Sequence, residues 1–296
     1  MNNMPARVRL AAMIGLAVIL LLAAGCVRIG EKYDEQLQIH FLDAGQADAA
    51  LLQYKGKYML IDTGDVDGRP ALVKMLKDKG VKELDAVLLS HPHGDHMGGM
   101  SALFQHFSIK RICDNGQVIH TAMYKNYVKN IAERHIPYTV LKRGDKIVFA
   151  DDVVCHILWP AVQDGFDYGM SESSRTNNQS VVCKVVFGDF SVLFTGDIQY
   201  EGETAILRTV HHSQLKSTIV KVGHHGSQTS SGLAFIQAVR PVAAVISCGA
   251  GNSYGFPHQK VLDSLQKYGA IIYRTDRNGM VSVRSDGKTY AVAKER

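Results

Sequence analysis

Apolar and polar residues alternate in two successions of strands, and helical periodicity follows each succession. The expected strands are residues 37–42, 49–54, 58–61, 86–89, 109–113, 138–141, 146–149, 153–159, 181–187, 190–194, 219–222 and 242–247, with three short strands near the end of the chain. The expected helices are residues 70–79, 98–107, 120–134, 201–210, 229–239 and 257–268. Because the same order recurs in both halves, we expect an α/β (α+β) domain in which two sheets pack face to face with helices outside.

One segment between the predicted strands has no periodicity. Residues 163–180 are polar and rich in serine. Long loops of this kind in compact domains are often lids or binding loops. We therefore expect an irregular loop that borders the functional site.

Residues 1–25 depart from this pattern and have the organisation of an export signal. Arg7 and Arg9 precede an uncharged apolar stretch that ends in Ala-Ala-Gly-Cys26. This ending resembles a bacterial lipobox, with Ala23 where leucine is usual, so we expect Cys26 to be lipidated after cleavage. Cleaved secretion and an uncleaved anchor helix are the alternatives, and about fifteen apolar residues are short for a bilayer span.

The expected location is therefore extracytoplasmic, as a cell-surface or membrane-anchored lipoprotein or, alternatively, as a secreted protein. Residues 27–35 would form a polar tether, and residues 36–296 the folded domain. The net charge of +5 permits an anionic partner without requiring one. The remaining cysteines have no CxxC spacing, and we expect buried free thiols, although export would allow one disulfide bridge. They are Cys113, Cys155, Cys183 and Cys248.

The most concentrated chemistry follows the apolar run 86–89 directly. The next residues read Ser-His-Pro-His-Gly-Asp-His-Met-Gly-Gly, so that His91, His93, Asp95 and His96 put three imidazoles and a carboxylate within six positions. An apolar run that ends in a turn is typical of a buried strand end, where such side chains can point into one cavity. A helix face would not gather them at this spacing. Imidazoles and carboxylates suit zinc, manganese or iron, so the segment predicts a metal site.

Three further predicted strands end in metal-ligating residue types, namely Asp62, Asp197, and either His224 or His225. A single aspartate at a strand end is weak evidence, because aspartate is common in turns. Four strand ends that carry ligands in the order Asp, HxHxDH, Asp, His are much more specific.

This order of ligands resembles the metallo-β-lactamase superfamily, and the resemblance extends over residues 36–292. It is closer still to the extracytoplasmic metallo-β-lactamase-like domain of ComEC-type competence proteins, without their membrane channel, because only the export segment is apolar enough to span a membrane. The matching segments are residues 42–49, 60–64, 90–96, 177–180, 193–197, 221–227 and 252–258. The resemblance implies a stand-alone hydrolase domain with a four-layer αββα sandwich fold.

The resemblance also implies a role for each matching residue. The implied ligands are His91 and His93 for a first metal, Asp95, His96 and His224 for a second, and Asp197 as the bridge. Asp62 would hydrogen-bond behind the histidines and orient them. His224 and His225 are adjacent, and we prefer His224 as the ligand because it is nearer the strand.

The sequence departs from the superfamily pattern at the third histidine of the first metal. Asn177-Asn-Gln-Ser180 stands there, as in the ComEC-like group, which leaves open positions for water or substrate and weakens metal retention. We therefore expect one or two divalent ions, zinc or manganese. Two smaller departures are Ala47 in place of a turn glycine and Phe256 in place of a histidine.

These features predict a metal-dependent hydrolase that uses metal-bound hydroxide as nucleophile, with Asp95 or Asp197 orienting the water. No Ser-His-Asp order or P-loop offers another nucleophile. The candidates for binding an anionic substrate are Asn177, Ser180, Lys221, His225, Ser227 and His258. For His258, an exposed loop histidine with no role is the alternative.

The expected substrate is extracytoplasmic nucleic acid, cut by a phosphodiesterase or DNase activity, or another phosphodiester such as a choline phosphate of the cell envelope. The alternative is a surface nucleic-acid-binding lipoprotein, linked to DNA uptake, whose metal site is structural. A β-lactamase is less favoured, because the third histidine of the first metal is missing and the ComEC-type segments match more closely.

Overall fold

The computed structural model describes residues 35–160 and 170–296. The export segment, Cys26 and nearly all of the tether lie outside these residues. None of the helices within the described part is both long and apolar enough to cross a bilayer.

The first large sheet has eight strands and contains the N-terminal half of the domain together with the last two strands. Its order is β17 (Tyr290–Lys294), β16 (Val281–Ser285), β1 (Leu37–Phe41), β2 (Ala50–Tyr54), β3 (Lys57–Ile61), β5 (Ala86–Leu88), β7 (Ile112–Asp114) and β8 (Tyr138–Val140). Pairing is antiparallel from β17 to β3 and parallel from β3 to β8.

The second large sheet has seven strands and repeats this change of direction. Its order is β15 (Ile271–Arg274), β14 (Ala243–Ile246), β13 (Ile219–Lys221), β12 (Phe190–Phe194), β11 (Val182–Phe187), β10 (Val153–Trp159) and β9 (Lys146–Ala150). Strands β9 to β12 are antiparallel, and β12 to β15 are parallel. A separate small sheet pairs β4 (Glu83–Leu84) with β6 (Ser108–Ile109).

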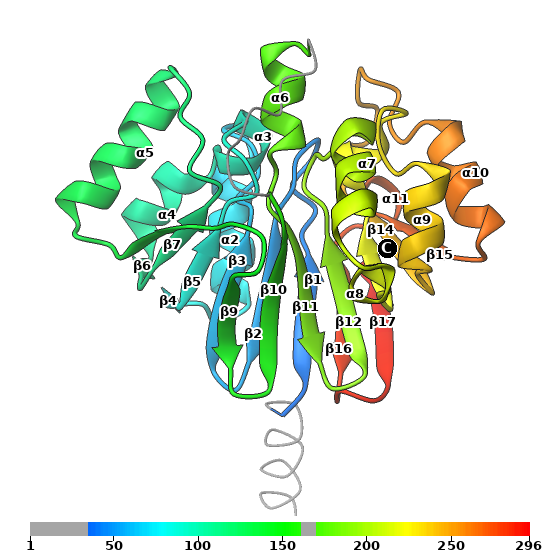
Figure 1. Cartoon of the computed structure of the whole chain (residues 1–296). Coiled ribbons are helices and arrows are strands. Elements are labelled where there is room, and N and C mark those ends of the chain that lie inside the picture. The colour runs from blue at the N-terminus through cyan, green and yellow to red at the C-terminus, as the bar shows by residue number, and fades with distance from the viewer. Residues whose placement is uncertain (1–34, 161–169) are drawn as a thin grey trace, which may run out of the picture.

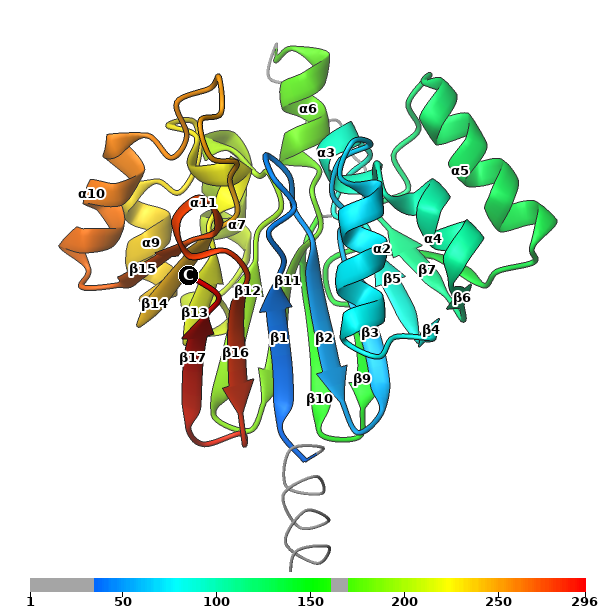
Figure 2. The same cartoon turned by 180° about the vertical axis from the view of Figure 1, so that it is seen from behind.

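Helices cover the outer faces of both sheets (Figures 1 and 2). Those beside the first sheet are α2 (Arg69–Asp78), α3 (Gly94–Met97), α4 (Met100–His106) and α5 (Ala122–Glu133). Later in the chain come α6 (Glu172–Asn178), α7 (Tyr200–Thr209), α8 (His212–Leu215), the 3₁₀ turn η1 (Gly223–Gly226), α9 (Leu233–Val239), α10 (Gln259–Lys267) and α11 (Thr275–Asn278). The predicted αββα sandwich is confirmed.

Strand alternation explains the layers. Along β2, Leu52 faces the core between the two sheets, whereas its neighbour Leu51 faces the helices over the first sheet. Phe41 and Phe194 meet across the two sheets with ring centroids 5.7 Å apart. The four cysteines predicted to be buried free thiols are buried and unbridged.

Two local features differ from expectation. Asp95 and His96, expected in the turn after the strand, belong to the short helical turn α3, ahead of the helix predicted at residues 98–107. Part of the segment predicted to be irregular is helix α6, which Ser171 caps by accepting a hydrogen bond from the Ser174 amide at 3.1 Å. Residues 163–169 of that segment lie outside the described part.

Candidate metal centre

The candidate ligands lie at the carboxyl ends of strands from both sheets. Asp62 follows β3, the histidine cluster follows β5, Asp197 follows β12, and the turn η1 follows β13. Parallel strands bring their carboxyl ends to one edge of a sheet, and the packing of the two sheets brings these edges together. In Figure 1 this edge is the upper one, where α3 and α6 lie.

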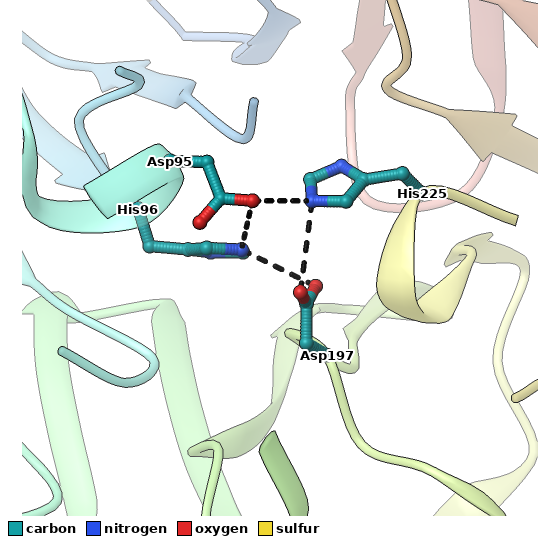
Figure 3. Close-up of side chains that lie close together, drawn as sticks. All are labelled: Asp95, His96, Asp197 and His225. Atoms are coloured by element: carbon teal, nitrogen blue, oxygen red, sulfur yellow. Dashed lines mark hydrogen bonds and ion pairs between the residues drawn. The ribbon is translucent and has the colours of Figure 1, made fainter. Parts of the chain in front are cut away.

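Four side chains converge closely enough to hold one cation: Asp95, His96, Asp197 and His225 (Figure 3). His96 Nε2 lies 3.2 Å from Asp197 Oδ1, and His225 Nε2 lies 3.2 Å from Asp95 Oδ2. His225 Nε2 is also 3.6 Å from Asp197 Oδ2, and His96 Nε2 is 3.9 Å from Asp95 Oδ2. The side chains of all but Asp95 are nearly inaccessible, whereas that of Asp95 is 33% exposed and forms the open side of the group.

His91 and His93 lie beside this group. His91 Nε2 is 3.0 Å from His93 Nδ1 and 4.0 Å from Asp197 Oδ2. Asp197 therefore directs one carboxylate oxygen toward His96 and the other toward His91, His224 and His225. This is the orientation that a bridging carboxylate requires.

The structure places the two adjacent histidines of η1 differently from the expectation that His224 is the ligand. His225 belongs to the four-residue group, whereas His224 lies at its border with Nε2 3.8 Å from Asp197 Oδ2. Both residues have left-handed backbone angles, with φ of 48° and 53°. Successive left-handed residues are strained, and the two imidazoles lie with their ring centroids 6.3 Å apart, so that His225 contacts Asp95. Distance from the strand therefore does not decide which imidazole reaches the group.

Hydrogen bonds behind the histidines fix which nitrogen faces the site. His96 Nδ1 lies 2.9 Å from Asp62 Oδ2, so Nε2 points to the group. Asp62 also accepts hydrogen bonds from the Ser90 amide and hydroxyl, at 2.7 and 2.8 Å. His225 Nδ1 lies 3.0 Å from the Ser247 carbonyl oxygen, which leaves His225 Nε2 facing Asp95.

Buried atoms without hydrogen-bond partners test whether the group fits a metal. Among the described residues, His96 Nε2 and Asp197 Oδ1 are buried and make no hydrogen bond, although they lie 3.2 Å apart. Buried polar atoms are normally hydrogen-bonded, so each such pair needs an explanation. Two ligand atoms that converge on a common cation provide one. The donor set of two imidazoles and two carboxylates suits zinc or manganese.

A second cluster, Asp48, Asp62 and His96, is also close enough to hold a cation. However, Asp62 is already hydrogen-bonded to His96 Nδ1, and the carboxylate of Asp48 forms an ion pair with Lys221. We therefore assign this cluster to the support of the first group.

Charge and burial divide the histidines into two kinds. Burial lowers the pKa of His91 well below its usual range, and burial also lowers the pKa of His93 and His224. Burial would lower the pKa of His225 too, but the carboxylates of Asp197 and Asp48 raise it to about 10. Burial would lower the pKa of His96 as well, but the carboxylates of Asp197 and Asp62 raise it well above its usual range. Neutral imidazoles have a lone pair ready for a metal, whereas a cation would have to displace a proton from His96 and His225.

Asn177 begins the segment 177–180, in which the sequence departs from the ligand pattern that it resembles. It is 2% exposed, its Nδ2 lies 3.4 Å from His224 Nε2, and its Oδ1 has no hydrogen-bond partner among the described residues. The structure therefore brings this predicted substrate-binding residue to the site.

Four other predicted substrate-binding residues have partners of their own in the structure. Lys221 is 3% exposed, because its ammonium group is paired with Asp48 and donates to the Val222 carbonyl oxygen at 3.0 Å. His225 belongs to the metal group. The other two are buried hydroxyls with local partners. Ser180 Oγ accepts from the Asp197 amide and lies 3.3 Å from His91 Nδ1, and Ser227 Oγ is 3.0 Å from Thr229 Oγ1.

His258 is half-buried and precedes α10, and its Nδ1 accepts from the Gln228 amide at 3.0 Å.

The sequence analysis did not single out two residues that support the site. Asp48 lies 3.2 Å from His225 Nδ1, and the hydroxyl of Ser90 lies between Asp62 and His91. Both lie in segments that match the resembled family, residues 42–49 and 90–96, and this position was the signal in the sequence that could have identified them.

Comparison with known proteins supports this interpretation. Residues 42–161 match the family described as Metallo-beta-lactamase superfamily. The chain is 32% identical over 266 residues to ComE operon protein 3 of Bacillus subtilis (strain 168), covering 83% of this chain and 33% of that protein. It is 29% identical over 264 residues to Competence protein ComA of Neisseria gonorrhoeae, covering 89% of this chain and 34% of that protein. The chain thus spans about a third of the length of these relatives.

A solved structure shares the fold. The metallo-beta-lactamase fold protein YhfI from Bacillus subtilis superposes with a TM-score of 0.55 at 11% identity, covering 83% of this chain and 99% of that one. The matched family model, the similar competence proteins and this shared fold together show that the chain contains a metallo-β-lactamase domain.

Proposed function

We propose that this chain is a metal-dependent phosphodiesterase that cuts extracytoplasmic nucleic acid or another phosphodiester. The observation that carries the proposal is the convergence of Asp95, His96, Asp197 and His225, with His91 and His93 beside them, at one edge of the sandwich. The ligand types of this group fit a divalent cation, and so do its buried atoms that have no hydrogen-bond partner, His96 Nε2 and Asp197 Oδ1. We expect the cation to be zinc or manganese.

A divalent cation in this group would activate water at neutral pH and neutralise charge on a phosphodiester. The side chains of the chain itself hold the ligands in place. Asp62 orients His96, and the Ser90 and Ser180 hydroxyls lie 3.0 and 3.3 Å from His91 Nδ1, which directs Nε2 inward.

The two carboxylates of the group have different surroundings and therefore different roles. Asp197 is buried between the histidines and is suited to bridging two ligand sets. The side chain of Asp95 is 33% exposed, so it can contact both the group and solvent. We assign to Asp95 the orientation of the attacking water. Asn177 is suited to contact the substrate, because its Nδ2 lies beside His224 and its Oδ1 has no hydrogen-bond partner among the described residues.

The choice of substrate rests on two supports. The first support is similarity: one relative is named a competence protein, and the motifs resemble the domain of ComEC-type proteins. The second support is the ligand set, which lacks the third histidine of the first metal and therefore suits an anionic phosphodiester better than a β-lactam.

We also propose that residues 1–25 direct export and that lipidated Cys26 anchors the domain to the outer face of a membrane, with secretion as the alternative. Such a location would place the site where external DNA is accessible. Metabolic labelling with a fatty acid, comparing the chain with a Cys26→Ser variant, tests the anchor; equal labelling of both refutes it.

The test of the activity uses the full chain, purified in mild detergent, stripped of metal and then supplied with zinc or manganese. Bis-p-nitrophenyl phosphate, linear DNA and nitrocefin are the substrates, and His93→Ala is the control. We expect metal-dependent cleavage of the first two, lost in His93→Ala. No turnover of any substrate would refute the hydrolase. DNA retained equally by both proteins, without cleavage, would instead support a nucleic-acid-binding lipoprotein with a structural metal.

A further inference from the structure

A cluster of aromatic rings lies beside the metal centre on the loop between β14 and α10. Tyr254 and Phe256 are stacked, with ring centroids 5.3 Å apart and an interplanar angle of 20°. Tyr254 is 63% exposed, although large aromatic side chains usually find cover. His258 meets Phe256 edge to face at 5.1 Å. The outer face of the Tyr254 ring is thus open to a ligand.

The loop that carries these rings is held by its own hydrogen bonds. The Asn252 side-chain Nδ2 donates to the Gly249 and Phe256 carbonyl oxygens at 2.9 and 2.8 Å. The Asn252 side-chain Oδ1 accepts from the backbone amide of Phe256 at 3.0 Å. The Gly249 amide donates to Gln46 Oε1 at 3.0 Å, which joins the loop to the first motif of the chain. A preorganised platform loses little conformational entropy when a ligand stacks on it.

The rings lead directly to the metal centre. Phe256 contacts His224 edge to face, with centroids 5.9 Å apart, and His224 Nε2 lies 3.8 Å from Asp197 Oδ2. The row Tyr254, Phe256, His224 therefore runs from solvent to the bridging carboxylate. In Figure 1 the orange loop before α10 stands at the same upper end as α3 and α6.

The arrangement favours a flat, uncharged ring over a cation. Cages for quaternary ammonium groups need several aromatic faces turned toward one point, whereas Tyr254 and Phe256 are almost parallel and present one outer face. Residues 247–262 also contain no aspartate or glutamate that could hold a cation. Nearly parallel rings instead extend a stack, as the aromatic side chains of single-strand-binding proteins do with nucleobases.

We propose that Tyr254 and Phe256 form a stacking platform for an unpaired nucleobase of single-stranded nucleic acid, which places the adjoining phosphodiester at the metal centre. The proposal rests on the proposed function and specifies its substrate as single-stranded. A base in a duplex is already stacked and paired, so it gains little from the platform.

Binding measured in the presence of a chelator tests the platform apart from cleavage. Fluorescence anisotropy with the full chain in detergent would compare a labelled strand of about 15 thymidines with an abasic sugar-phosphate strand of the same length. The variants are Tyr254→Leu, which removes the ring, and Tyr254→Phe, which keeps it. Thermal unfolding of each variant checks that the fold is retained.

We expect Tyr254→Leu to weaken binding of the thymidine strand about ten-fold, Tyr254→Phe to bind as the unchanged protein does, and the abasic strand to respond to neither substitution. Equal binding of the thymidine strand by all three proteins, or equal affinity of the unchanged protein for both strands, would overturn the proposal. Absence of metal-dependent turnover would refute the hydrolase while leaving these affinities readable.

Discussion

Replacement of Lys221 by methionine separates a structural ion pair from a substrate contact. Lys221 and Asp48 are 3% and 4% exposed, and their charged groups are in direct contact. Methionine keeps most of the aliphatic stem and removes the charge. Asp48 would then remain buried with His225 Nδ1, 3.2 Å away, as its nearest remaining positive partner.

The expected loss of stability follows from the burial of this pair. Removal of one partner of a buried ion pair costs about 3–5 kcal/mol, because the other charge stays uncompensated. Since His225 offsets part of this cost, we expect Lys221→Met to lower the free energy of unfolding by about 3 kcal/mol. Asp48→Asn added to Lys221→Met removes the orphaned charge, and the double variant should recover part of the loss.

Urea denaturation of the metal-free protein measures this effect, with the fluorescence of Trp159, the single tryptophan of the chain, as the probe. Lys125→Met, at an exposed position of α5, is the matched control and should change the free energy of unfolding by no more than about 0.5 kcal/mol. If Lys221→Met unfolds like the control while its KM for bis-p-nitrophenyl phosphate rises, Lys221 binds substrate and our assignment is wrong.

Two further substitutions test the support of the site and the pH response of the fold. Asp62→Asn should weaken metal affinity about 10- to 100-fold in a chelator competition, because the orienting hydrogen bond to His96 Nδ1 is weakened; unchanged affinity would contradict that role. Burial lowers the pKa of His40 from 6.5 to about 3, so the unfolded chain takes up a proton that the folded chain does not, and stability falls as the pH drops below the unfolded value. Between about pH 7 and pH 5 this group should cost about 2 kcal/mol, seen as a steeper loss of unfolding free energy in the unchanged protein than in His40→Gln; parallel pH profiles would refute it.

The sequence was sufficient for the layers of the fold and for most of the ligand set. Strand periodicity puts neighbours such as Leu51 and Leu52 on opposite faces of the sheet, and the predicted apolar run 86–89 ends one residue beyond β5. These features depend on local period and on the edge of a parallel sheet, and both can be read directly from residue order.

Side-chain direction within a turn could not be read in this way. His224 and His225 have the same type and neighbouring positions, and only their left-handed backbone angles decide which one faces Asp95. The role of Lys221 was missed for a related reason. Its partner Asp48 is far away in the sequence, and a lysine near a site is interpreted as an anion contact unless its burial is known.

The metal centre is divided between the two sheets, and this division has a physical consequence. Asp95 and His225 lie 130 positions apart, the first after a strand of one sheet and the second after a strand of the other. Neither sheet alone presents two imidazoles and two carboxylates to one point, so the ligand geometry exists only when the sheets are packed through contacts such as Phe41 with Phe194. Binding of a cation therefore stabilises the packed sandwich relative to the unfolded chain, and loss of inter-sheet packing should weaken metal binding even where every ligand is intact.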